Sequence, residues 1–80
     1  MARRTTWQPF QEGVKLPIAF EQDLRSQCCT LLINGKPNKQ WTSVKEPGDF
    51  EAPYVTTHNG IKVELSWDED EDKPILKLDG

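Results

Sequence analysis

The clearest alternation of apolar and polar side chains lies in the segment PYVTTHNGIKVELSW, residues 53–67. Asn59-Gly60 at its centre suits a two-residue type I′ turn, in which both residues take positive φ. The turn fixes the register, which pairs His58 with Ile61, Thr56 with Val63, and Tyr54 with Leu65. Apolar residues then share one face, and a one-residue slip would move them to the other. The pattern therefore predicts a β-hairpin over residues 54–67.

Four more segments have strand character. They are GVKLPIAF (residues 13–20), CCTLLIN (28–34), QWTSV (40–44) and PILKL (74–78). Pro17 lacks the N–H that a ladder needs, so the first strand is expected at a sheet edge or at a bulge. The second is the most apolar run and predicts a buried central strand. Gly35 and Pro37 in NGKPNK, residues 34–39, predict a loop after it.

We therefore expect a mainly β domain, a small antiparallel barrel or sandwich of five to six short strands. The segment EQDLRSQ, residues 21–27, is the one place for a short helix, and a turn suits it equally well. With the helix, the domain would be a compact α+β domain, which is the alternative. Residues 1–12 are expected to form an N-terminal arm, flexible or partly anchored by Trp7 or Phe10. Residues 13–80 then form a single small domain.

Composition makes the predicted core thin. The chain has 80 residues, of which 35% are hydrophobic and 29% charged. A domain of this size buries only about 60% of the surface that its unfolded chain exposes. Dimerisation or docking on a partner would add the missing apolar burial.

The charges of the chain are distributed unevenly along it. The net charge is −3, but residues 1–45 carry seven Lys or Arg against three Asp or Glu, a net of +4, and residues 46–80 carry three against ten, a net of −7. Either the two halves attract each other within the fold, or an acidic surface is left for a basic partner.

The cysteines and the N-terminus indicate the compartment. Cys28 and Cys29 are adjacent, and neighbouring residues in a strand point to opposite faces. We therefore expect two reduced thiols and no disulfide framework. The segment MARRTTWQPF lacks the apolar run of a signal peptide, and no segment approaches the ~20 apolar residues of a membrane span. We expect a cytoplasmic protein without a membrane segment.

No catalytic or metal-binding pattern is found in the sequence. Asp68, Asp70 and Asp72 have the spacing that opens a calcium loop, but the sixth place holds Lys73 instead of the required glycine. One histidine, His58, and two adjacent cysteines do not form a zinc pattern, and no nucleophile motif accompanies them. We expect no metal, no cofactor and no enzymatic activity.

A run of acids beside an aromatic residue is the strongest candidate for a binding surface. Five consecutive acids follow Trp67 and connect two predicted strands. Acidic groups steer association with a basic protein, and Trp and Tyr are enriched at interface hot spots. The predicted partner-binding residues are Asp68, Glu69, Asp70, Glu71, Asp72, Trp67 and Tyr54. The sequence thus favours a small acidic protein-binding module, of the type found among phage accessory proteins and inhibitors of host enzymes.

Two other functions remain open. A single-stranded nucleic-acid-binding β-barrel would use the basic N-terminal half, with cations along the backbone and aromatic rings stacked on bases. Its predicted residues are Arg3, Arg4, Lys36, Lys39, Trp7 and Trp41. The overall acidity opposes this role. The third possibility is a structural subunit of a larger assembly, such as a homodimer formed through an edge strand.

Overall fold

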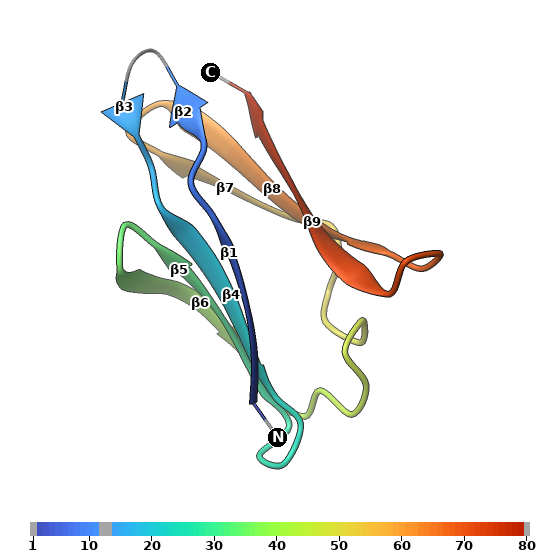
Figure 1. Cartoon of the computed structure of the whole chain (residues 1–80). Coiled ribbons are helices and arrows are strands. Elements are labelled where there is room, and N and C mark those ends of the chain that lie inside the picture. The colour runs from blue at the N-terminus through green and yellow to red at the C-terminus, as the bar shows by residue number, and fades with distance from the viewer. Residues whose placement is uncertain (1, 12–13, 80) are drawn as a thin grey trace.

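A computed structural model describes residues 2–11 and 14–79, and these residues form nine β-strands and no helix. The strands are β1 (Ala2–Trp7), β2 (Phe10–Gln11), β3 (Val14–Lys15), β4 (Ile18–Asp23), β5 (Cys28–Ile33), β6 (Lys36–Trp41), β7 (Tyr54–His58), β8 (Ile61–Asp68) and β9 (Lys73–Asp79). They make two larger antiparallel sheets, with orders β1-β4-β5-β6 and β7-β8-β9, and a small β2-β3 pair. The described sheets do not close into a barrel (Figure 1).

The apolar run at residues 28–34 forms the central strand that was predicted. β5 lies between β4 and β6, and its side chains alternate in burial. Phe20 stands opposite Leu31 and Ile18 opposite Ile33, and all four are buried. These cross-strand pairs supply most of the four-stranded sheet's inner face.

The strand predicted over residues 13–20 is divided at Pro17. β3 ends at Lys15 and β4 begins at Ile18, and β4 lies inside the four-stranded sheet, not at the predicted edge. Leu16 N–H donates to the Pro9 carbonyl at 3.1 Å, and the Pro17 carbonyl accepts from Asn34 N–H at 2.8 Å. The proline therefore occupies a break before the strand, where its missing N–H costs no ladder bond.

The loop predicted over residues 34–39 is only the turn at Asn34 and Gly35, and the strand predicted over residues 40–44 lies earlier in the chain, as β6. Asn34 and Gly35 take positive φ of 54° and 79°, and the chain reverses there directly into β6. β6 is an edge strand, and its ladder with β5 has a register shift between Leu31 and Leu32. Edge strands and bulges are where a sheet tolerates proline, so Pro37 fits inside β6.

The hairpin over residues 54–67 has the predicted register. Asn59 and Gly60 have φ of 51° and 80°, and Tyr54 pairs with Leu65, as Thr56 does with Val63. β9 then pairs with β8, which confirms the last predicted strand and makes β8 the central strand of its sheet.

Gly60→Ala is expected to lower the free energy of unfolding by about 1 kcal/mol. A Cβ at this position meets nothing within 4 Å, so the cost comes from the positive φ alone. Urea denaturation followed by tryptophan fluorescence measures it. An unchanged midpoint would contradict the type I′ turn.

The short helix predicted near residues 21–27 is wrong, and so is the α+β alternative. β4 continues to Asp23, and a turn follows over residues 24–27. The Asp23 carboxylate accepts the N–H of Arg25 at 3.1 Å, which closes this turn and lowers the pKa of Asp23. Gln22 points into the core, so the segment lacks the apolar alternation that would have marked it as a strand.

Residues 2–7, which the sequence places in an arm, form β1 and pair with β4 along their whole length. Trp7 is half-buried and packs against the core. Met1 and Glu12 of the predicted arm, and the side chain of Phe10, lie outside the described residues.

Both larger sheets contribute to one hydrophobic core. Its buried members are Leu16, Ile18, Phe20, Cys29, Leu31, Ile33, Trp41, Val44, Phe50, Val63 and Leu65. The chain crosses from β6 to β7 through residues 42–53, which supply Val44 and Phe50 (Figure 1). The ring centroid of Phe20 lies 5.0 Å from that of Phe50 and 6.0 Å from that of Trp41. This aromatic cluster joins the crossing segment to the four-stranded sheet.

Candidate protein-binding surface

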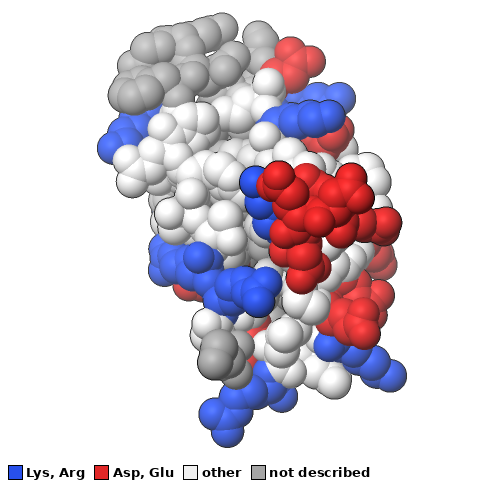
Figure 2. Space-filling view, turned by 45° about the vertical axis from the view of Figure 1, so that its right-hand side comes forward, with Lys and Arg blue, Asp and Glu red and all other residues white. Residues whose placement is uncertain are grey.

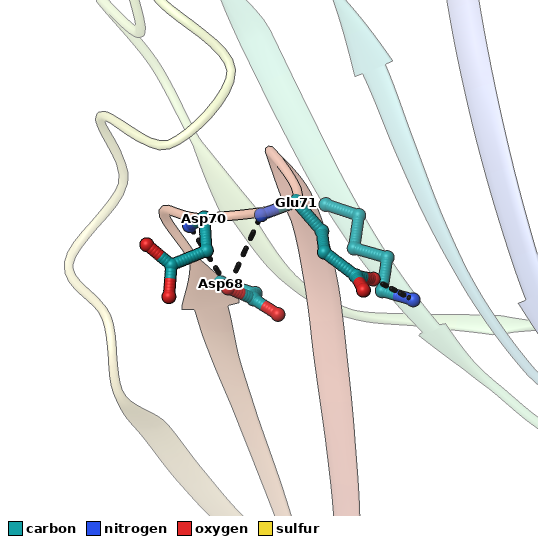
Figure 3. A network of polar contacts seen from close by, with 4 residues as sticks. Asp68, Asp70 and Glu71 are labelled. Atoms are coloured by element: carbon teal, nitrogen blue, oxygen red, sulfur yellow. Dashed lines mark hydrogen bonds and ion pairs between the residues drawn. The ribbon is translucent and has the colours of Figure 1, made fainter.

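The five acids form the connection between β8 and β9, as predicted. Asp68 is the last residue of β8, and we call residues 68–72 the acidic turn. The Asp68 carboxylate accepts the N–H groups of Asp70 at 3.0 Å and of Glu71 at 3.3 Å (Figure 3). Asp72 closes the turn with a positive φ of 55°, a conformation that Asp and Asn adopt more easily than other residues. The sequence of acids is thus compatible with the tight turn that it has to make.

Most of the acidic turn is not neutralised by cations of residues 2–11 and 14–79. Among the described residues, the turn has one ion pair, between Glu71 and Lys73. That pairing raises the pKa of Lys73, because the Glu71 carboxylate stabilises the ammonium. Glu69, Asp70 and Asp72 are exposed. Their charges therefore face solvent.

A second segment extends the negative surface. Residues 46–49 of the crossing segment lie against the acidic turn and add Glu46 and Asp49 to it. Together they border a hollow of about 380 Å³, which we call the acidic hollow. It is lined by Glu46, Pro47, Gly48, Asp49, Trp67, Glu69 and Asp72. Figure 2 shows the Asp and Glu side chains gathered on this side of the molecule.

Close packing around Gly48 holds the two segments together. A Cβ on Gly48 would stand 2.7 Å from Cδ1 and Nε1 of Trp67, so only glycine lets the loop lie this near the indole. On the other side, Gln22 Nε2 donates to the Pro47 carbonyl at 2.6 Å. Trp67 also meets Phe50 edge-on, with ring centroids 6.2 Å apart. These contacts give the acidic hollow a fixed wall and an aromatic base.

Tyr54 is placed away from the acidic hollow. Its ring packs edge-on against Trp41 at 5.2 Å between centroids, and its hydroxyl donates to Asn38 Oδ1 at 3.0 Å. It therefore bridges β7 to β6. Of the two predicted aromatic partner-binding residues, Trp67 lines the hollow and Tyr54 does not.

The residues predicted for nucleic-acid binding do not all lie on one surface. Arg3 and Arg4 lie on β1, whereas Lys36 and Lys39 lie on β6, and these strands are the opposite edges of the four-stranded sheet. Three strand spacings of ~4.8 Å separate them. Consecutive strand residues also point to opposite faces, so Arg3 and Arg4 diverge, and Arg4 pairs with Glu21 at 3.0 Å.

The two tryptophans of that prediction also serve the core. Trp41 is 6% exposed, so its ring is covered and is not accessible to a base. Trp7 is half-buried against the core cluster. Arg4 and Trp7 line one hollow of about 300 Å³, but Arg4 is paired with Glu21. The other four predicted residues, Arg3, Lys36, Lys39 and Trp41, do not line it.

The remaining reactive side chains are dispersed. Burial raises the pKa of the Cys29 thiol, whose place is on the inner face opposite Gln22. Cys28 lies on the opposite face, and both cysteines are free thiols. Within residues 2–11 and 14–79, no group of three His, Cys, Asp or Glu side chains has an arrangement that could hold a metal ion.

The sequence indicates only part of the acidic hollow. Its pattern predicts residues 67–72 but not Glu46, Gly48 or Asp49, because the segment EPGDFEAP, residues 46–53, has the Pro and Gly content of a loop and no further signal. In this segment two acids, Glu46 and Asp49, flank Pro47-Gly48. This pattern does not indicate a contact with Trp67.

Comparisons with known proteins identify no relative. The part of the chain that the structure describes contains no helix long and apolar enough to cross a membrane. No protein-family model, no curated protein and no solved structure matches the chain.

Proposed function

We propose that this protein is a small, non-catalytic module that binds a basic surface of another protein through the acidic hollow. The observation that supports this proposal is that two segments far apart in the sequence meet at Trp67. They are residues 46–49 and 67–72. Of the acids in the turn, one has an ion pair with a cation of the described chain. An unneutralised acidic surface around an aromatic residue suits electrostatic steering followed by apolar contact.

The way the hollow is built favours a preorganised contact. The Asp68 carboxylate fixes the acidic turn, and Gln22 and Gly48 fix the opposite wall. A surface that is already ordered loses less conformational entropy when it binds. We place the protein among the small cytoplasmic accessory proteins, such as inhibitors that cover a basic groove of a host enzyme. The sandwich-like packing of its two sheets provides the rigid frame.

Neutralising the exposed acids of the acidic turn, two of which line the acidic hollow, is expected to slow association. The triple variant Glu69→Gln, Asp70→Asn and Asp72→Asn removes three negative charges and keeps the shapes of the side chains, and Asn accepts the positive φ of position 72. Asp68 stays, because its carboxylate closes the turn. We expect the association rate with the captured partner to fall about tenfold at low salt, with a weaker salt dependence. Affinity capture from the source cell identifies the partner, and stopped-flow kinetics measures the rate.

A matched control removes the same charge elsewhere. The control variant carries three substitutions outside the acidic hollow, one of them in the other sheet. They are Glu21→Gln, Glu64→Gln and Asp79→Asn. This variant is expected to keep most of the association rate. If both triple variants slow association equally, net charge alone acts and the hollow is not the contact surface. An unchanged rate in the first variant at low salt would rule the surface out.

A further inference from the structure

The outer edge of β7 is the one edge of the two larger sheets without charge or proline. A sheet edge presents unpaired backbone groups, and proteins protect such edges with Lys, Pro and bulges. β1 carries two arginines, β6 carries two lysines, Pro37 and a register shift, and β9 carries Pro74 and three charged residues. β7 has the sequence YVTTH, rich in residues that favour strands.

The hairpin register determines which backbone groups of β7 are free. A two-residue turn makes His58 and Ile61 a pair that exchanges both of its hydrogen bonds. The pattern alternates along the strand, so Val55 and Thr57 direct their N–H and C=O groups away from β8. Neither residue has a backbone hydrogen bond to another segment of the described chain.

Side chains at this edge are also open. Val55 is 47% exposed, and among the described residues Leu24, at 38%, is the one other exposed large apolar side chain. Thr57 is exposed beside it on the same face. Tyr54 bonds to Asn38 of β6, so the beginning of β7 adjoins the other sheet while its middle faces outward.

We propose that a second copy of this chain pairs with the edge of β7, antiparallel, about a twofold axis at Thr56. Val55 then lies opposite Thr57 of the second copy, and Thr57 opposite its Val55. Each of these pairs exchanges two hydrogen bonds, so four backbone bonds join the copies. The result is a continuous six-stranded sheet, β9-β8-β7 followed by the same strands in reverse order.

A second copy fits this edge better than a charged partner does. A twofold rotation brings the free N–H groups of Val55 and Thr57 in one copy to the free C=O groups of the same residues in the other copy. Pairs of Val with Thr and Thr with Thr are favourable across strands, and no like charges face each other. The acidic turn lies beyond the Tyr54 end of β7, so an antiparallel arrangement places the two acidic turns at opposite ends of the joint sheet. Their repulsion does not oppose the pairing.

The interface is small, so the dimer forms at high protein concentration. Sedimentation equilibrium from about 10 µM to 1 mM covers the range expected for a small interface. The unmodified protein is expected to move toward twice the monomer mass across this range. Thr57→Pro removes an outward N–H that β8 does not use, so it should weaken dimerisation at least tenfold. Thr57→Val keeps this N–H and a strand-forming side chain, and it should dimerise as the unmodified protein does.

Amide hydrogen exchange of the unmodified protein tests the same edge without a substitution. The amides of Val55 and Thr57 should exchange at least tenfold more slowly at the high concentration than at the low one, while those of Thr56 and His58 are protected at both. A monomer at every concentration, a Thr57→Pro variant that dimerises unchanged, or concentration-independent exchange at Val55 and Thr57 would overturn the proposal. These results do not depend on the acidic hollow, which lies on other residues.

Discussion

Phe20→Ala is expected to destabilise the protein by about 3–5 kcal/mol and to leave it largely unfolded at 25 °C. Phe20 is completely buried and packs against both Trp41 and Phe50. It therefore connects the four-stranded sheet with the crossing segment. A domain of this size has a net stability of only about 3–5 kcal/mol, so the loss of the Phe20 ring is as large as the whole free energy of unfolding. Near-UV circular dichroism and urea denaturation measure the effect.

Two variants calibrate this result. Phe20→Leu keeps most of the volume and should cost no more than about 1.5 kcal/mol. Leu24→Ala removes a large apolar side chain at the β4–β5 turn that is 38% exposed, and it should change stability by about 0.5 kcal/mol or less. Equal losses for Phe20→Ala and Leu24→Ala would mean that Phe20 is not in the core.

Gly48→Ala is expected to cost about 1–3 kcal/mol, because the new methyl group overlaps the Trp67 indole. The added Cβ would stand 2.7 Å from two atoms of that ring, and either the loop or the ring has to move. Urea denaturation gives the loss of stability. Because Trp67 forms the base of the acidic hollow, its fluorescence should shift as well.

A double-mutant cycle separates this contact from backbone strain. In a Trp67→Phe background the ring is smaller, so the cost of Gly48→Ala should fall by at least about 0.5 kcal/mol. Gly35→Ala is the matched control: its Cβ meets nothing within 4 Å, and its cost arises from a positive φ. Trp67→Phe should leave that cost unchanged. If both alanine variants respond equally to Trp67→Phe, the contact between Gly48 and Trp67 is not the cause.

The hairpin with its register was predictable because the determining signals are local. Asn59-Gly60 specifies the turn, and the alternation from Tyr54 to Trp67 fixes which face is buried. Asn34-Gly35 makes the same kind of turn, but Pro37 shortly after it made the segment read as a loop. Pro37 is compatible with a strand here because β6 lies at the edge of its sheet. The order of strands in a sheet cannot be derived from the local sequence.

The end of β4 and the second wall of the acidic hollow required tertiary information. Gln22 is buried, and its amide donates to the Pro47 carbonyl, 25 positions later in the chain. A polar residue at an inward position interrupts the alternation of apolar and polar residues that marks a strand. For this reason the sequence of residues 21–27 resembles that of a helix or a turn. The same hydrogen bond helps to place Glu46 and Asp49 beside the acidic turn. No periodicity or motif in the sequence records such a contact.

The placement of charged and aromatic residues separates the functional hypotheses. The acids lie on adjoining segments around one aromatic residue, whereas the cations expected to bind nucleic acid lie on opposite edges of a sheet. A phosphate backbone binds best where several cations line one path. This arrangement supports protein binding as the proposal to test first.

The crossing segment, residues 42–53, gives the molecule a bipartite construction. Each larger sheet comes from one continuous half of the chain, and these halves have net charges of +4 and −7 when divided at residue 45. The two halves share a core and are joined covalently only through this segment. A chain cleaved there would yield two oppositely charged fragments with complementary apolar faces, the requirements for a split protein that reassembles from its pieces.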